Sequence, residues 1–323
     1  MSRTQKGGHH GAAALHTHRG DFYILYPDLP GNGPEPDGDT INFLPDHDGL
    51  VQNLQRFSNK APDRRHLGTY PVRFEGIDTL ETHFPDHRFH QNLQFAEAAR
   101  NHLLQQLGFG AVTFLSGSKR NKVATAEHHP VRGYLFANGI ESNGRILGMV
   151  YPGEPPAALG ADDGDRVFVT TDLFDASINA QHIRDGLAYG ELYDTMPIAL
   201  ADHIAAAVKT VRAAGQGFWP VENVGVGTAA TIPTIAPLSE LVMFPKLYRR
   251  LVKYFTDPTV PAGQGLSGFD QWVRADPVLR DDRLILPNRE VGNLHDIYAI
   301  TGDSLELALL PEDVIYQPDP PLP

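Results

Sequence analysis

The stretch of sequence that decides the fold is Val-Arg-Phe-Glu-Gly-Ile-Asp-Thr-Leu-Glu at 72–81, read together with Asp-Gly-Asp-Thr at 37–40. The apolar residues around Arg73 predict a strand that ends at Asp78, where side chains can converge on one ligand. Aspartate oxygens suit a hard divalent cation, Glu81 can accept a proton from water, and an arginine can hold a phosphate by paired hydrogen bonds. Together these are the minimum parts for hydrolysis of a phosphodiester.

The same two segments resemble the signature of the thermonuclease (staphylococcal nuclease-like) family. Leu80 stands where that pattern usually has proline, while the acids are in place. The resemblance implies an α+β, mainly β fold, in which helices pack on a five-stranded OB-fold β-barrel. It also implies a calcium-dependent phosphodiesterase site that accepts DNA and RNA and leaves a 3′-phosphate.

The resemblance extends over residues 20–219, with further segments in the family's order. These are an amphipathic helix at 96–108, a glycine turn and strand at 142–151, a short helix with Gly-Leu-Ala at 177–188, and a closing helix at 201–217 followed by Trp219. Asp-Gly-Asp-Thr alone is a common turn, so the ordered set of matches makes the resemblance specific.

The resemblance implies a role for each of six residues. Calcium ligands would be Asp39, Asp78 and the Thr79 carbonyl, the general base would be Glu81, and the phosphate clamps would be Arg73 and Arg145.

The second clamp has a rival, because Arg132 also precedes a glycine and a predicted strand. Arg145 is preferred because the Gly144 turn comes just before it. Ser142 and Asn143 replace the family's usual lysine and tyrosine at this turn. This difference from the family pattern lies in the part that binds substrate, so it affects the expected substrate preference and leaves the candidate catalytic acids unchanged.

Composition limits the class of protein. The chain has 323 residues, enough for about two domains, and it has no cysteine, which excludes disulfides. No apolar run reaches the roughly 18 residues that a membrane span needs, and the polar start lacks the apolar core of a signal peptide. We therefore expect a cytoplasmic protein with no membrane contact.

The chain divides by composition into three parts. Residues 1–19 predict a disordered tail, residues 20–220 the barrel domain, and residues 221–323 an accessory α/β extension joined by a segment rich in Pro, Gly and Ala. The apolar run 238–244 predicts that the extension docks on the barrel. A helix at 245–255 carries a basic face that is either solvated or in contact with phosphate.

The net charge of −12 argues against the prediction of a nuclease, since nucleic acid is a polyanion that a protein of the same sign repels. It favours an alternative, a catalytically weak or inactive module that binds nucleic acid or a protein partner. The extension could itself bind the protein partner. His83, His87 and His90 resemble a loose transition-metal set, but Pro85 between them favours a polar loop.

Overall fold

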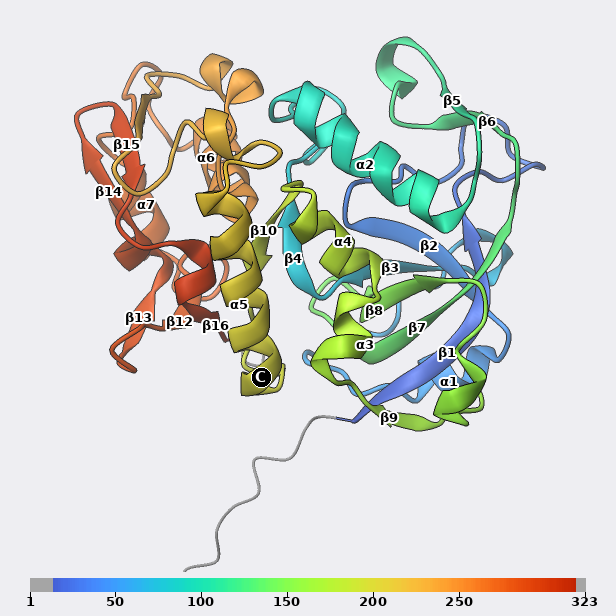
Figure 1. Cartoon of the computed structure of the whole chain (residues 1–323). Coiled ribbons are helices and arrows are strands. Elements are labelled where there is room, and N and C mark those ends of the chain that lie inside the picture. The colour runs from blue at the N-terminus through green and yellow to red at the C-terminus, as the bar shows by residue number, and fades with distance from the viewer. Residues whose placement is uncertain (1–13, 318–323) are drawn as a thin grey trace, which may run out of the picture.

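The computed structural model describes residues 14–317 and contains a closed, mixed, five-stranded β-barrel (Figure 1). The barrel strands are β1 (Ala14–Tyr23), β2 (Thr40–Pro45), β3 (Tyr70–Phe74), β7 (Val131–Ile140) and β8 (Ile146–Pro152). Their order is β2-β3-β8-β7-β1, and pairing of β1 with β2 closes the barrel. Only the β3–β8 pair in the barrel is parallel. The predicted α+β, mainly β class is confirmed, and the topology is compatible with an OB-fold-like barrel.

Two glycines let the barrel strands coil closely around the core. A Cβ on Gly133 would lie 2.4 Å from the Phe22 ring and 2.6 Å from the Tyr151 carbonyl oxygen. A Cβ on Gly20 would lie 2.1 Å from the Leu44 carbonyl oxygen. Because no larger side chain fits at either position, the tight curvature of β1 and β7 depends on glycine.

The strand around Arg73 that was predicted to end at Asp78 is in fact two strands. β3 stays in the barrel, and Gly76, with φ of 83°, turns the chain into β4 (Gly76–Thr79). β4 pairs with β10 (Ala188–Glu191) in a separate two-stranded sheet beside the barrel (Figure 1). The break matters because it carries Asp78 and Thr79 away from the barrel wall and toward the C-terminal region.

Helices cover the barrel side from which β4 departs (Figure 1). They are α2 (Leu93–Leu107), α3 (Thr171–Asp175), α4 (Ile178–Arg184) and α5 (Ile198–Ala213), with the short α1 (Asp48–Gln52) in the β2–β3 connection. α2 begins three residues before the predicted start, where the Asn92 side chain accepts from the Gln94 N–H. It stops at Gly108, as predicted, and Gly108 has a left-handed conformation.

Asn179 of α4 fixes the helices to the barrel. Its amide oxygen accepts from the Val150 N–H at 3.0 Å, and its amide nitrogen donates to the Glu75 carbonyl at 2.9 Å. One buried side chain therefore satisfies the backbone at the point where β3 gives way to β4.

The remaining strands form small sheets. β9 (Arg166–Phe168) extends the barrel sheet at β1, and β5 (Val112–Phe114) pairs with β6 (Val123–Ala126). In the C-terminal region, β11 (Ala229–Thr231), β15 (Ser304–Leu307) and β14 (Tyr298–Thr301) form one sheet, and β13 (Val291–Asn293), β12 (Arg283–Ile285) and β16 (Ile315–Tyr316) form another.

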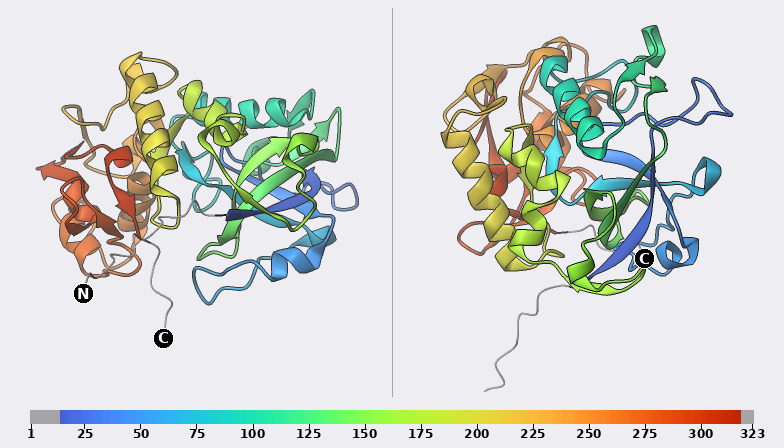
Figure 2. Two further views of the ribbon diagram at one scale, coloured as in Figure 1. Left: turned by 60° about the horizontal axis from the view of Figure 1, so that its bottom comes forward. Right: turned by 45° about the vertical axis from the view of Figure 1, so that its right-hand side comes forward.

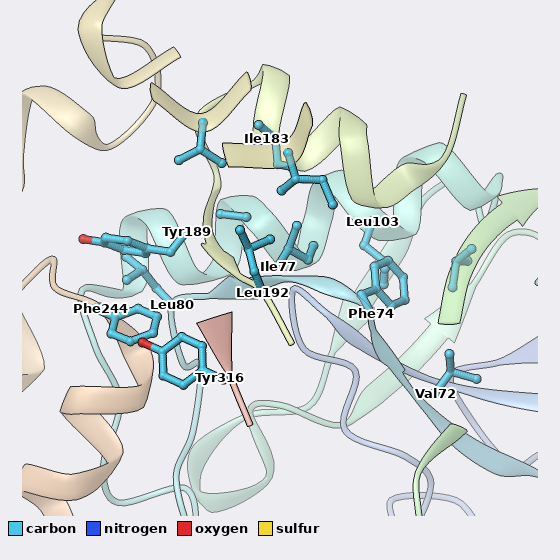
Figure 3. Close-up of a cluster of buried hydrophobic side chains, with 14 of the residues drawn as sticks. Val72, Phe74, Ile77, Leu80, Leu103, Ile183, Tyr189, Leu192, Phe244 and Tyr316 are labelled. Carbon is cyan, nitrogen blue, oxygen red and sulfur yellow. The ribbon is translucent and has the colours of Figure 1, made fainter. Parts of the chain in front are cut away.

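The C-terminal region also contains α6 (Pro245–Thr256) and α7 (Phe269–Arg274), and it lies against the β4–β10 side of the molecule (Figure 2). Its Phe244 and Tyr316 join Leu80 and Tyr189 in one buried cluster (Figure 3). The ring centroids of Tyr189 and Phe244 are 5.7 Å apart. The docking expected from the apolar run 238–244 is therefore present.

One prediction for the N-terminal tail is wrong. Residues 14–19, assigned to a disordered tail over 1–19, lie in β1 and pair with both β7 and β9. Leu15 and Thr17 are buried there, so strand pairing on two sides orders a segment whose composition is polar. Residues 1–13 lie outside the described part of the chain. Among residues 14–317, no helix has the length and apolarity to cross a membrane.

Candidate active site

Two segments that are separated in the sequence bring the candidate acids to one place. The turn before β2 carries Asp39, β4 carries Asp78 and Thr79, and the loop that follows carries Glu81. The turn packs directly on β4, because a Cβ on Gly38 would lie only 2.4 Å from the Thr79 hydroxyl. The Thr79 N–H donates to Asp39 Oδ2 at 2.8 Å, which fixes the two segments together.

Arg73 of β3 is the centre of this group. Its Nη1 contacts Asp39 Oδ2, and its Nη2 donates to Asp78 Oδ1 at 2.6 Å and to Glu191 Oε2 at 3.0 Å. The Arg73 side chain is only 8% exposed. A buried guanidinium thus joins carboxylates from the turn, from β4 and from β10.

A second arginine enters the site from the other end of the sequence. Arg249 of α6 binds the Asp78 carboxylate through both terminal nitrogens, with Nη1–Oδ1 and Nη2–Oδ2 distances of 3.0 Å each. Its Nη1 also donates to Glu81 Oε1 at 2.5 Å. Arg249 therefore bridges a predicted metal ligand and the predicted general base.

Two more cations of α6 hold the helix in place. Lys246 Nζ lies 2.9 Å from Glu191 Oε1 and 3.2 Å from Asp282 Oδ1, and Arg250 donates to Asp282 Oδ2 at 2.6 Å. Three of the four cations on the predicted basic face of this helix, Lys246, Arg249 and Arg250, are therefore paired with acids, which belong to β4 and the loop after it, to β10 and to the C-terminal region. The fourth, Lys253, is exposed to solvent.

We call the main group the Arg73 cluster. It consists of Arg73, Arg249 and Lys246 with Asp39, Asp78, Glu81 and Glu191.

The cluster separates the pKa values of its acids. Burial opposes ionisation of Asp39 and Glu191, but their cationic neighbours outweigh it and hold both pKa values below the usual range. Burial raises the pKa of Asp78 despite Arg249. Burial, with the charges of Asp37 and other acids, raises the pKa of Glu81 to about 8 against the pull of Arg249. Glu81 is thus the group that exchanges a proton near neutral pH.

The two candidates for the second clamp lie in different surroundings. Arg145 is held by Glu141 at 3.1 Å, and its charge contributes to lowering the pKa of Asp39. Arg132 is bound by Asp46 and Glu154 at 2.5 and 2.6 Å, with Asp21 at 3.9 Å. We call this second group the Arg132 cluster. Of the two arginines, Arg145 is the one whose charge acts on an acid of the Arg73 cluster.

The predicted calcium ligands do not fit a metal ion in this arrangement. Arg73 contacts one carboxylate oxygen each of Asp39 and Asp78. Arg249 binds both oxygens of Asp78 and one oxygen of Glu81, so each of these acids already has a cationic partner. Across residues 14–317, no three side chains among His, Cys, Asp and Glu form a group able to hold a metal. His83 instead pairs with Glu35 at 3.2 Å.

Sequence reasoning missed Arg249, Lys246 and Glu191. The only available signal was the basic face of the 245–255 helix in a chain of strong negative charge, which is compatible with a solvated face as well as with acids or phosphate opposite it. No family model matches the sequence, and no curated protein matches it.

Proposed function

We propose that the Arg73 cluster is the active site of a phosphodiesterase that cleaves single-stranded DNA or RNA. The observation that supports this most is the arrangement of Glu81 beside Arg249 and near Asp78, with a pKa raised to about 8. A carboxylate with such a pKa, next to a guanidinium group, can exchange protons with water while phosphate charge is stabilised nearby.

The chemistry proceeds through residues of the chain itself. Glu81 takes a proton from water as the water oxygen adds to phosphorus, and the bond from phosphorus to the leaving oxygen breaks. The leaving oxygen takes a proton from solvent. Arg73, with Arg145 as the second clamp, stabilises the charge that builds on the phosphoryl oxygens. Since Asp39, Asp78 and Glu81 already bind guanidinium groups, no step is assigned to calcium.

The test is cleavage of single-stranded DNA and RNA by the full-length protein, with Ca²⁺ and with EDTA, from pH 6 to pH 10. Activity that rises with pH through about 8 and falls in Glu81→Gln supports the proposal. Glu154→Gln is the matched control, because Glu154 binds Arg132 in the Arg132 cluster. Intact substrates under all these conditions would refute catalysis.

One observation favours the second candidate, a non-catalytic module. The charges of the Arg73 cluster neutralise one another, and Asp78 has a side-chain exposure of 0%. In that case the cluster would serve to dock the C-terminal region, and a partner would bind elsewhere. Retention of nucleic-acid or protein binding in a folded Glu81→Gln variant, with no cleavage by the wild type, would select this candidate.

A further inference from the structure

The cation between Asp78 and Glu81 comes from α6, more than 160 residues later in the chain. We propose that Arg249 is a phosphate-binding residue of the active site and stands where the family resemblance places calcium. Anion binding at the site is then independent of divalent ions. This inference deepens the proposed function and rests on it for the identity of the ligand.

The bonding pattern of Arg249 is the first support. A divalent ion would use carboxylate oxygens of Asp78 and Glu81, and Arg249 now binds both side chains with three hydrogen bonds. A guanidinium presents a planar fork of donors that matches carboxylate and phosphate alike. The same group can therefore hold the acids in place and meet a phosphate.

The balance of charge is the second support. Three cations, Arg73, Arg249 and Lys246, already face the four carboxylates of Asp39, Asp78, Glu81 and Glu191, which leaves at most one negative charge uncompensated. A divalent ion would add two positive charges to this buried group, which low polarity makes unfavourable.

Accessibility is the third support. Arg249 has a side-chain exposure of 20%, compared with 8% for Arg73 and 7% for Lys246. Among the cations of the Arg73 cluster, Arg249 is thus the one that an incoming phosphate meets first. Arg73 lies deeper and is already shared among three carboxylates.

The helix that carries Arg249 is firmly anchored. Leu247, Tyr248 and Leu251 of α6 are completely buried. Lys246 and Arg250, which precede and follow Arg249 in the sequence, both bind acids. A side chain on such a helix is held in position before any ligand arrives, which lowers the entropic cost of binding. The geometry is that of a fixed binding residue, not of a mobile plug.

The first measurement uses the unmodified protein. Binding of the dinucleotide TpT is followed by calorimetry in EDTA and then in Ca²⁺, and Tb³⁺ luminescence reports any site for a metal. The proposal expects the same affinity for TpT in both buffers and no stoichiometric Tb³⁺ site. Binding of TpT that requires Ca²⁺ would overturn it without any variant.

The second measurement compares Arg249→Gln with Arg274→Gln. Arg274 is the matched control, because it is an exposed arginine of α7 paired with Asp270. Loss of one charge-assisted fork should weaken TpT binding in EDTA by about 10- to 100-fold in Arg249→Gln only. The same variant should gain Tb³⁺ binding, because the carboxylate oxygens of Asp78 and Glu81 lose the guanidinium group that binds them.

The remaining outcomes are also decisive. Tighter TpT binding or faster cleavage in Arg249→Gln would show that Arg249 blocks the site, and the proposal would fail. If Arg249→Gln does not fold, Arg249→Lys keeps the charge and loses the fork, and unchanged affinity in that variant would count against the proposal. If the wild type binds TpT through Arg249 but never cleaves, the phosphodiesterase proposal fails while the binding role stands.

Discussion

The Arg73 cluster and the Arg132 cluster have the same kinds of side chain but differ in their surroundings. Arg132 is 36% exposed and binds its acids at the protein surface, whereas Arg73 is 8% exposed and Asp78 has no exposed surface. Around Arg132, the hydrogen bond from the arginine lowers the pKa of Asp46. In the Arg73 cluster, the pKa values of Asp39 and Glu191 are lowered by cationic neighbours, whereas burial raises the pKa of Glu81 to about 8. Burial, not composition, therefore separates a candidate active site from a surface ion network.

Truncation after residue 220 should have the largest effect. It removes Arg249 and Lys246 from the Arg73 cluster and exposes Leu80 and Tyr189, whereas the Arg132 cluster loses nothing. We expect a loss of several kcal/mol of stability, which lowers the Tm of a domain of this size by about 10 °C or more. Calorimetry of residues 1–220 and of the full chain measures this difference in Tm. Equal Tm values and equal turnover would show that the C-terminal region is independent of the site.

Glu81→Gln should lower cleavage by about 10²–10⁴-fold, the usual loss for a positioned general base. The variant should remain folded, because glutamine has nearly the same shape and can still accept from Arg249. Cleavage of single-stranded DNA by Glu81→Gln and Glu154→Gln is compared at pH 9. An equal loss in both variants would remove the distinction between the two clusters.

Arg73→Ala and Arg132→Ala should differ in stability. Removal of the buried cation takes from Asp39, Asp78 and Glu191 the one guanidinium group that they share and should cost about 3–5 kcal/mol. Loss of the exposed Arg132 should cost about 0.2–1 kcal/mol. Urea denaturation at pH 7 measures both free energies. Similar costs would mean that burial at Arg73 has little energetic weight.

The smallest expected effect is a pH dependence that arises near the cluster. Glu75 is buried with Asn138 as its hydrogen-bond donor, and burial raises its pKa to about 7. Because the pKa of Glu75 is higher in the folded protein than its ordinary value of 4.5, protonation of Glu75 favours the folded state. This contribution is fully present below pH 4.5 and is lost as pH rises through about 7. We expect a loss on the order of 1–3 kcal/mol between pH 5 and pH 8.

Urea denaturation of the wild type and Glu75→Gln at both pH values measures this loss. Glu75→Gln should reduce it by removing this titration. Asp46→Asn is the contrasting variant, because the lowered pKa of Asp46 gives a contribution that is lost as pH falls instead. A wild-type profile that rises from pH 5 to pH 8 would contradict the assignment.

Local patterns in the sequence predicted much of the fold. The spacing of apolar residues predicted α2 and α5, and the segments at 37–40 and 72–81 predicted that Asp39, Asp78 and Arg73 come together. Two local features were missed. Gly76 reads as one more residue of a strand but turns the chain out of the barrel, and the polar residues before Arg19 hid the start of β1.

Arg249 could not be placed from the sequence for a different reason. Its partners Asp78 and Glu81 lie 171 and 168 residues away, so no local periodicity connects them. A basic helix face in isolation is normally solvated, and only the docking of α6 on β4 reveals that acids lie opposite. The calcium prediction depends on the same contact, because it assumed that the carboxylates were free.

The position of Arg249 in the chain also bears on protein synthesis. A ribosome makes Asp78 and Glu81 early, but Arg249, which binds both, is made only 171 residues after Asp78 and 168 residues after Glu81. Until then Arg73 is the only cation of the cluster that Asp39 and Asp78 can contact, Glu81 lacks its arginine, and Leu80 and Tyr189 are uncovered. Contacts of such long sequence separation form late in folding. The protein therefore acquires its complete site only near the end of translation, when the C-terminal region reaches the barrel.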